Sequence, residues 1–261
     1  MSILFSTFFS GGRFTMDTKS VSAFRILKAS IALFREKGFD NTSIREIAAA
    51  SGVSVGLINH YFMNKDILGT QCLILIDQYA SQNMVRNLSI DDEPILYDLV
   101  ATRVLYHYMR RNGYAQFYAD SLKNDFFFKY LSKRPSVIVQ KLSRFYDISG
   151  TDDEVQLYCR FMPYMMEKTL VLKKSEGLFP SISDDQIPYY IVVTALSHFI
   201  PESEIASQDA QSIRLADEYL APLQPIIPDA FIGDYVERYL RDLEEAAANM
   251  KSQLILQMKR N

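Results

Sequence analysis

The chain has 261 residues, of which 48% are hydrophobic and 23% charged, and this balance excludes a disordered chain, a collagen and a protein made only of coiled coil. The formal net charge is −3, although residues 1–70 carry eight Lys and Arg against five Asp and Glu, and residues 71–261 carry twenty against twenty-six. The two cysteines are widely separated, which argues against a disulfide framework and a zinc site. No apolar run reaches the roughly 20 residues of a membrane span, which argues against a bilayer crossing. We therefore expect a cytoplasmic protein with a mildly basic beginning and an acidic remainder.

The chain begins with an apolar segment that has no basic residues before its apolar stretch, so it does not match a secretory signal. We interpret residues 1–16 as a disordered arm or as upstream sequence included by a mistaken start. A first helix is predicted over about residues 21–37, because apolar side chains recur every three or four positions there. Gly38 follows the last turn, where a left-handed residue commonly ends a helix.

A second helix is predicted to begin at Thr42 or Ser43, and the pattern does not decide between them. Either hydroxyl can accept a free N–H group of the first turn, and Ser43 has a glutamate three residues later, the spacing of a capping box. Gly52 allows the positive φ of a tight turn, and Ser54 can cap a third helix that runs to about Phe62. Two short helices joined by a glycine turn are typical of a helix-turn-helix.

The rest of the chain is predicted to be helical, because no alternation of apolar and polar residues indicates a strand. A long helix is expected to begin after Asn64-Lys65 and to extend toward Met84. Pro163 is expected to kink or split the helix in which it lies, because it lacks an N–H group. The further helices are expected near residues 92–111, 114–131, 135–147, 152–176, 184–200, 209–220 and 229–259.

The most specific pattern is TSIREIAAASGVSVGLINHYFMNK, at residues 42–65. Together with RIL and IALFREKGF before it and NKDIL at its end, it resembles the DNA-binding domain of the tetracycline-repressor (TetR) family of bacterial regulators, over about residues 25–68. The resemblance implies an all-α protein with a three-helix DNA-binding head at residues 17–68 that contains the helix-turn-helix. It also implies a larger helical body for effector binding and dimerisation at residues 69–261.

The predicted recognition helix is expected to have Ile58 and Phe62 as buried anchors, with Val53 filling the corner of the turn. The remaining side chains then lie on or beside its outward face. A DNA major groove accepts one such helix, and Asn59 and His60 can form hydrogen bonds there with base edges or phosphates.

The resemblance places phosphate contacts at Tyr61 and Lys65. Many family members carry a tyrosine where this chain has Asn59, and an asparagine at this position can read an adenine. The full set of predicted DNA-binding residues is Thr42, Ser43, Ser54, Val55, Gly56, Leu57, Asn59, His60, Tyr61 and Lys65.

Tyrosine, phenylalanine and methionine are concentrated in the middle of the chain. Such side chains commonly fill a core, but tyrosines carry polar tips that suit a cavity for an apolar or planar ligand. In the TetR family such a body pocket typically binds a small effector. The residues expected to line it here are Tyr106, Met109, Phe117, Tyr118, Phe161, Tyr164, Met165 and Tyr190.

The last predicted helix carries apolar residues at alternating steps of four and three, the pattern of a helix that pairs with another helix. The alternative is an amphipathic helix packed on its own domain. The resemblance implies a homodimer formed by late helices, here this one and the helix at 184–200, and two recognition helices that read a palindromic site with half-sites about 34–36 Å apart. The residues of the predicted interface are Val236, Leu240, Leu243, Ala247, Met250 and Leu254.

The resemblance therefore implies a ligand-responsive transcriptional regulator, a repressor that a small apolar or aromatic effector releases from its operator. The alternatives are a regulator controlled by a protein partner, and a helical carrier or enzyme on the same scaffold that does not bind DNA. The sequence has no P-loop, GxGxxG or HExxH pattern, and its three histidines lack a ligand cluster. We expect no enzyme, metal or cofactor, and as partners double-stranded DNA, an effector and a second copy of the chain, but no membrane.

Overall fold

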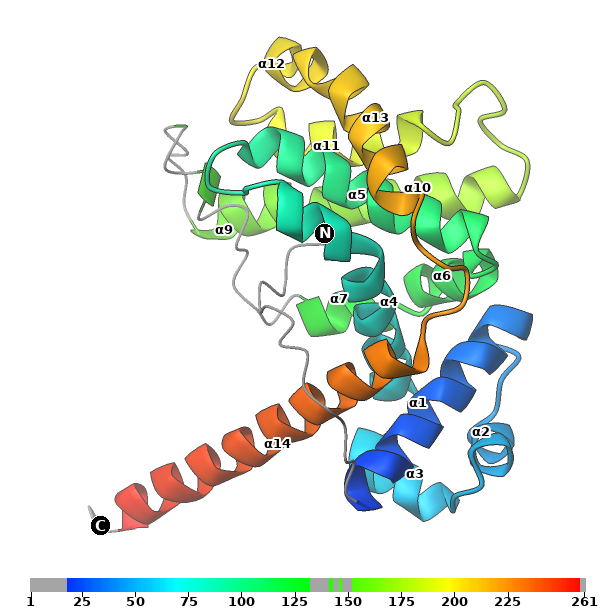
Figure 1. Cartoon of the computed structure of the whole chain (residues 1–261). Helices are drawn as coiled ribbons and strands as arrows, with labels where there is room; N and C mark the ends of the chain where they lie inside the picture. Colours follow the sequence, from blue (N-terminus) through cyan, green and yellow to red (C-terminus); the bar gives the residue numbers. More distant parts are fainter. Residues whose placement is uncertain (1–17, 132–140, 143–145, 147–151, 259–261) are drawn as a thin grey trace.

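The computed structural model of the chain describes residues 18–131, 141–142, 146 and 152–258. Within these residues every regular element is a helix, which confirms the predicted all-α fold. Figure 1 shows a head of three helices, a larger body, and a long last helix, α14 (Asp229–Met258), that runs beside the head and projects beyond it. Residues 1–16, interpreted above as an arm or a mistaken start, lie outside the described residues.

The head consists of α1 (Thr18–Lys37), α2 (Ile44–Ser51) and α3 (Val55–Phe62). Helix α1 buries one face, because its buried residues recur at positions 23, 26, 27, 30, 31 and 34. Ile47 of α2 and both Ile58 and Phe62 of α3 are fully buried in the same apolar cluster. The predicted anchors of α3 are therefore confirmed, and the head is a three-helix unit with one core.

Helix α4 (Lys65–Asn87) connects the head to the body. It begins three residues after α3 ends, and the side chain of Asn64 caps it by accepting the Ile67 N–H at 2.9 Å. Every residue from Leu68 to Asp77 is buried. Helix α4 is therefore a continuous packed helix that begins at the head and extends into the body.

The body is built around α5 (Pro94–Arg111), in which every residue from Pro94 to Met109 is buried. Arg103 on α5 is fully buried, and its guanidinium donates to Ser212 at 2.8 Å and to Asp209. The other helices of the body are α6 (Ala115–Lys123), α7 (Phe126–Leu131), α9 (Asp152–Gln156), α10 (Met162–Ser175), α11 (Gln186–Leu196), α12 (Glu202–Ser207) and α13 (Asp209–Leu220). Ser212 and Asp209 both belong to α13, so the bonds of the Arg103 guanidinium join α5 to α13.

Two predicted helices differ from the structure. The prediction of a single helix at 114–131 is wrong. Asp125 has a left-handed φ of 56°, which ends the helical path between α6 and α7. The helix predicted at 152–176 changes to a π-helical turn at Leu157–Phe161, directly before Pro163, as expected for a proline that removes a helical hydrogen bond. Helix α12 was not predicted, and the helix expected at 135–147 lies largely outside the described residues.

None of the helices in the described part of the chain combines the length and the apolar composition that a membrane span requires.

Gly38 joins the end of α1 to the body. It has a φ of 79°, and a Cβ atom there would lie 2.6 Å from Oδ2 of Asp120 and 2.6 Å from Cγ of Gln116. The same Asp120 oxygen accepts the backbone N–H of Asp40 at 3.0 Å. This position therefore needs glycine for its backbone angle and for the close approach of α6.

We expect Gly38→Ala to lower the free energy of unfolding by roughly 1–3 kcal/mol, because alanine is strained at positive φ and its methyl group would displace Asp120. Urea denaturation followed by circular dichroism measures the change. Gly56→Ala is the matched control, because Gly56 lacks a positive φ and its nearest neighbour would lie 3.8 Å from the new Cβ. Equal destabilisation by both substitutions would contradict the role of Gly38.

Candidate nucleic-acid interface

Ser43 caps α2, and Thr42 does not. The Ser43 hydroxyl accepts the Glu46 N–H at 3.2 Å, and the Glu46 carboxylate accepts the Ser43 N–H at 2.7 Å, which completes a capping box. Thr42 is buried, and its hydroxyl donates to the Gly38 carbonyl at 2.7 Å. Of the two predicted residues, only Ser43 presents its side chain at the surface.

The turn between α2 and α3 is formed by Gly52 and Ser54. Gly52 has a φ of 65°, and a Cβ atom there would lie 2.2 Å from Nη2 of Arg25. The Ser54 hydroxyl accepts the Leu57 N–H at 3.2 Å and thereby caps α3. These interactions set the angle at which α3 leaves the turn.

The outward face of α3 carries Asn59 and His60, which are both exposed. Ser54 and Gly56 are exposed as well, whereas Val55 and Leu57 are half-buried against the head core. The structure thus brings these six predicted residues together on or beside one eight-residue helix.

Tyr61 lies on the packed face of α3 and is only 9% exposed. The reason is helical periodicity, because Tyr61 stands three residues after the buried Ile58 and therefore shares its face. The predicted phosphate contact at Tyr61 stays a proposal, and its side chain is less accessible than expected.

Lys65 lies at the start of α4 and is half-buried. Its Nζ atom lies 4.0 Å from the centre of the Phe39 ring, a cation–π contact. Burial lowers the pKa of the Lys65 ammonium, although the neighbouring carboxylate of Asp40 opposes this shift. Lys65 is thus placed at the edge of the head, held against its core.

The recognition helix is also contacted by α14, a contact that the sequence analysis missed. The Tyr239 hydroxyl donates to the Tyr61 carbonyl at 2.8 Å, and the Tyr239 ring stacks on Phe62 with centroids 5.4 Å apart and planes 4° apart. One turn earlier, the Tyr235 hydroxyl donates to Gln71 of α4 at 2.6 Å. The only sequence signal was the spacing of Tyr235 and Tyr239, which places them on one face of a helix.

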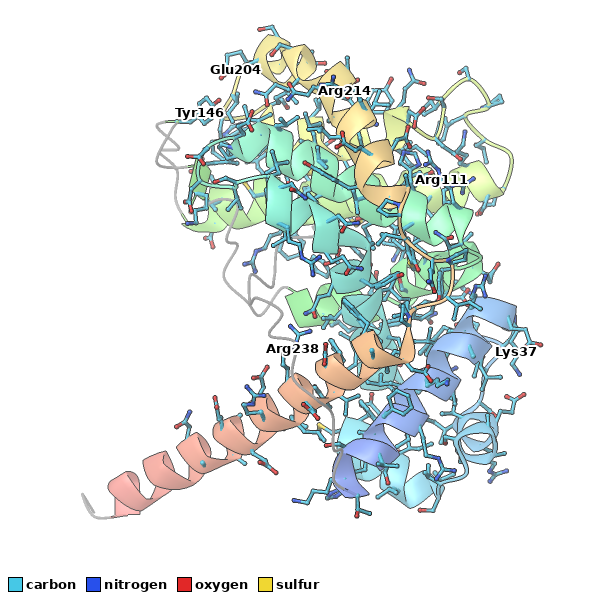
Figure 2. All side chains as sticks on the ribbon, viewed as in Figure 1. Lys37, Arg111, Tyr146, Glu204, Arg214 and Arg238 are labelled. Atoms are coloured by element: carbon cyan, nitrogen blue, oxygen red, sulfur yellow. The ribbon has the colours of Figure 1, made fainter. Side chains whose placement is uncertain are left out.

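Polar contacts accompany this aromatic contact. Lys28 of α1 pairs with Asp229 at 2.6 Å, and Arg238 of α14, labelled in Figure 2, donates to Gln78 of α4 at 2.9 Å. Exposed ion pairs contribute little to stability, so the attachment of α14 rests on the two tyrosines and on the buried Phe231, Ile232 and Val236.

The predicted effector residues are divided between the interior and the surface. Tyr106, Met109, Phe117, Tyr118 and Tyr164 are buried, and Tyr190 is half-buried. Phe161 and Met165 are 45% and 53% exposed, because α10 turns its other face, with Tyr164 and Glu167, toward the body. The structure therefore does not bring all eight residues together.

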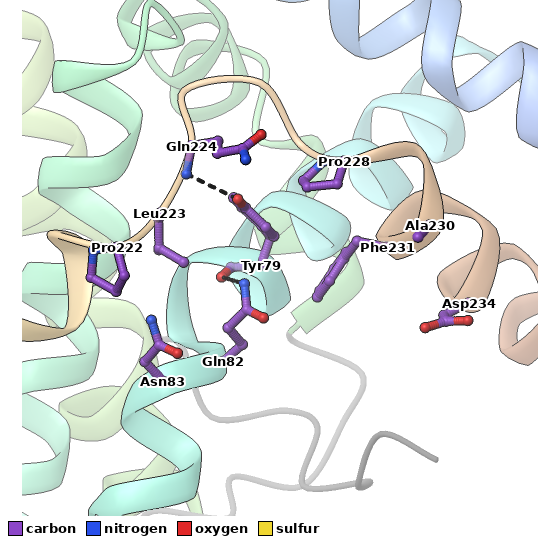
Figure 3. A pocket seen from close by; sticks show the side chains of 10 residues that line it. All are labelled: Tyr79, Gln82, Asn83, Pro222, Leu223, Gln224, Pro228, Ala230, Phe231 and Asp234. Carbon is purple, nitrogen blue, oxygen red and sulfur yellow. Dashed lines mark hydrogen bonds between the residues drawn. The ribbon is translucent and has the colours of Figure 1, made fainter. Parts of the chain in front are cut away.

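A surface groove of about 350 Å³ lies between α4, the connection after α13 and the start of α14 (Figure 3). None of the predicted effector residues lines it. The Tyr79 hydroxyl accepts the Gln224 N–H at 3.1 Å, and Gln82 donates to the Tyr79 carbonyl at 3.0 Å. The residues around the groove are Tyr79, Gln82, Asn83, Pro222, Leu223, Gln224, Pro228, Ala230, Phe231 and Asp234.

The predicted dimer residues follow α14 from the core outward. Val236 is fully buried in its own chain and Leu240 is half-buried, whereas Leu243 and Ala247 are exposed. The side chains of Met250 and Leu254 lie outside the described part of the structure. The first part of the pattern thus packs on its own chain, and the later part projects from it (Figure 1).

The segment from Gly52 to Gly56 also has the GxSxG spacing of a hydrolase nucleophile elbow. That elbow follows a strand, whereas this segment follows α2 and its serine caps α3. Among the described residues, no three His, Cys, Asp or Glu side chains are grouped in a way that would hold a metal ion.

Residues 26–68 match the family model of the bacterial regulatory proteins of the tetR family. Two curated relatives come from Bacillus subtilis (strain 168). The uncharacterized HTH-type transcriptional regulator YerO is 36% identical over 69 residues, 26% of this chain and 23% of that protein. The probable HTH-type transcriptional regulator YttP is 44% identical over 41 residues, 16% of this chain and 20% of that protein.

The chain thus spans less than a quarter of the length of these curated relatives. Among solved structures, a TetR-family regulator (SCO0857) from Streptomyces coelicolor A3 is 20% identical, with a TM-score of 0.37 over 81% of this chain and 99% of that chain. The predicted resemblance to the TetR family is confirmed over residues 26–68.

We expect Tyr239→Phe to lower the free energy of unfolding by about 1 kcal/mol, because it removes the hydrogen bond to Tyr61 and keeps the ring that stacks on Phe62. Tyr239→Ala removes both contacts and should cost roughly 2–4 kcal/mol. Urea denaturation measures both values. Tyr190→Phe is the control, because no hydrogen bond of the Tyr190 hydroxyl is found among the described residues, and an equal loss in this control would contradict the assignment.

Glu46 is expected to make the folding stability of the protein depend on pH. Its contact with Lys37, assisted by the N–H and hydroxyl of Ser43, lowers the pKa of Glu46 from 4.5 to about 2. A pKa lower in the folded state stabilises the fold above the unfolded value of 4.5, and this stabilisation is lost as the pH falls toward 2.

Above pH 5, the Tm of Glu46→Gln should therefore be lower than that of the wild type. The difference in Tm should shrink as the pH falls from about 4.5 to 2. Thermal unfolding at a series of pH values measures this. Lys37→Met should reproduce part of the loss over the same range, because Lys37 is the largest cause of the shift. A difference that stays constant with pH would contradict the prediction.

Proposed function

We propose that this protein is a transcriptional regulator that binds double-stranded DNA through α3 and is controlled by a small-molecule effector in its body. One observation carries the proposal. The segment that matches the TetR family, residues 26–68, is also the segment in which a capped, glycine-turned helix presents Asn59 and His60 to solvent.

The surface of α3 is suited to a major groove. Asn59 and His60 are exposed and can hydrogen-bond to base edges, and Gly56 lacks a side chain that would hold the helix away from DNA. The exposed Ser43 stands at the N-terminus of α2, where free N–H groups and the helix dipole favour a phosphate. Val55 and Leu57 are half-buried and offer apolar contacts to a thymine methyl group.

The route of control runs through α4 and α14. Gln71 on α4 and the Tyr61 carbonyl at the end of α3 are both hydrogen-bonded to tyrosines of α14, so the three helices form one connected unit. An effector that shifts α4 within the body would therefore change the position of α3. A coupling of about 1–3 kcal/mol between the two sites is typical of such regulators and suffices for release from DNA.

A second copy of the chain is the proposed partner of α14. Residues 241–249 are exposed, Glu244 among them pairs with Lys19 of α1 at 3.7 Å, and a helix that buries no apolar face is marginally stable in water. Pairing of the projecting part with its equivalent in a second copy would cover Leu243 and Ala247. Such a dimer would place two recognition helices for a palindromic operator, with half-sites about 34–36 Å apart. We propose repression as the outcome, because two bound heads would block a promoter.

We expect tight binding to DNA from directly upstream of the protein's own gene, and weak binding to scrambled DNA, in fluorescence anisotropy at two salt concentrations. Asn59→Ala and His60→Ala should each weaken specific binding by roughly tenfold or more, because each removes an exposed base-reading group. Higher salt should weaken binding of the wild type, since phosphate contacts release counterions. The stoichiometry should be two protomers per duplex.

Glu218→Gln, an exposed position on α13, is the control and should bind DNA as the wild type does. Equal, weak binding to both DNAs, together with a genome-wide selection that recovers no bound fragment, would contradict the DNA-binding proposal. DNA binding that no small molecule changes would favour control by a protein partner.

A further inference from the structure

Met63, the first residue after α3, combines an exposed side chain with a strained backbone. It is 75% exposed, and its φ of 60° and ψ of −54° lie close to the angles of a γ-turn with positive φ. The Asn64 N–H closes this turn by donating to the Phe62 carbonyl at 2.6 Å. A single exposed apolar side chain is ordinary, but a bulky residue in this backbone region is rare and requires an explanation.

The neighbours of Met63 impose this conformation. Phe62 before it is fully buried and stacks on the Tyr239 ring. The Asn64 side chain after it caps α4 by accepting the Ile67 N–H at 2.9 Å. Because both neighbours are held, the chain must reverse at the one residue between them. Such strain persists only where the surrounding contacts impose it, and it is concentrated at functional sites.

Glycine would adopt this conformation without strain, because it has no Cβ atom. The chain carries glycine at two other turns of the head, where Gly38 and Gly52 have φ of 79° and 65°. At residue 63 it carries a long apolar side chain instead, and most of that side chain has no contact with its own chain. This combination favours a contact of the Met63 side chain with a partner.

The other non-glycine residues with positive φ in the described part of the chain lie in the body, Asp125 with a φ of 56° and Phe179 with a φ of 57°. The Asp125 carboxylate accepts the Tyr164 hydroxyl and the Lys168 ammonium, both at 2.6 Å, so contacts within the chain account for its presence. Phe179 is 39% exposed, and its own chain covers more of it than of Met63. Of these three residues, Met63 is the most exposed and the one that lies in the head.

Met63 also extends the outward face of α3. Its N–H donates to the Asn59 carbonyl at 2.9 Å, so the helical path of α3 continues to its backbone nitrogen. It follows the exposed Gly56, Asn59 and His60 by seven, four and three positions, a spacing that places residues on one side of a helix. A recognition helix that presents Asn59 and His60 to a major groove therefore brings Met63 to the same duplex.

We propose that Met63 contacts DNA through its apolar side chain and thereby contributes to the affinity of the recognition helix. This inference rests on the proposed function, because it adds a contact residue to the same DNA-binding surface. Double-stranded DNA offers two apolar groups to such a side chain, the thymine methyl group in the major groove and the deoxyribose of the backbone. Methionine is unbranched and flexible, so its side chain can adapt to either group.

The test compares three substitutions of Met63 in the full chain. Fluorescence anisotropy measures binding to the duplex from directly upstream of the protein's own gene, or to the fragment that the genome-wide selection recovers. Met63→Ala and Met63→Gly remove the side chain and should each weaken binding roughly tenfold. Met63→Leu keeps an apolar side chain of similar size and should bind within about threefold of the wild type. The salt dependence of the affinity should be the same for all four proteins, because no charge is lost.

Thermal unfolding without DNA separates the backbone strain from the contact. Met63→Gly should raise the Tm by about 2–4 °C, because glycine relieves the strain at positive φ. Met63→Ala keeps the strain and should leave the Tm near that of the wild type. A higher Tm together with weaker DNA binding in Met63→Gly is a result that loss of folding cannot produce. Met165→Ala, which truncates an exposed methionine of α10, is the matched control and should leave DNA binding unchanged.

Duplexes that carry uracil in place of single thymines distinguish the two apolar groups of DNA, because uracil lacks the methyl group. A contact with a thymine methyl group predicts one position at which uracil weakens binding of the wild type but not of Met63→Ala. A contact with deoxyribose predicts no such position, and Met63→Ala then binds every duplex more weakly than the wild type does.

Two results would overturn the proposal and keep the regulator. The first is binding of Met63→Ala and Met63→Gly as tight as that of the wild type, in a protein whose Asn59→Ala variant binds weakly. The second is a Tm of Met63→Gly below that of the wild type, because the backbone at this position would then not be strained. Absence of specific DNA binding by the wild type would remove the regulator and the Met63 contact together.

Discussion

The contact of Tyr239 with α3 is the interaction that joins the last helix of the chain to the helix-turn-helix. A helix of eight residues does not persist in water alone, so α3 requires support from neighbours. Its buried side is covered by the head core, and its C-terminal end by the Tyr239 ring and hydroxyl. Two segments separated by 178 positions in the sequence thereby hold the recognition helix in place.

Helix α4 extends this dependence into the body. It receives the Tyr235 bond at Gln71, the Arg238 bond at Gln78 and the groove contacts at Tyr79, and between these residues it carries the buried Asp77. Packed helices transmit displacement because the interior has little free volume. Helix α4 thus joins the interior of the body to α14 through the hydrogen bonds at Gln71 and Gln78.

The parts of the fold that could be predicted from the sequence depend on neighbours within a few positions. The Ser43 cap and the Gly52 turn belong to this class, and the burial of Tyr61 could also have been predicted from its spacing to Ile58. The bond from Tyr239 to Tyr61 could not, because no local pattern encodes a contact between distant helices. Composition likewise identified aromatic residues but not their faces, so Phe161 and Met165 were expected in a pocket and lie at the surface.

Agreement between local sequence preference and tertiary structure is the rule in proteins, and departures from it concentrate where function imposes a cost. In this chain the helix-turn-helix follows the rule, since its caps, turn and core all favour the same arrangement. The body departs from it at Asp77, Thr102 and Glu167, where burial is not matched by pairing among the described residues. Burial raises the pKa of Asp77 to about 8, so near neutral pH the cost of burying this acid is met by protonation rather than by a charged partner.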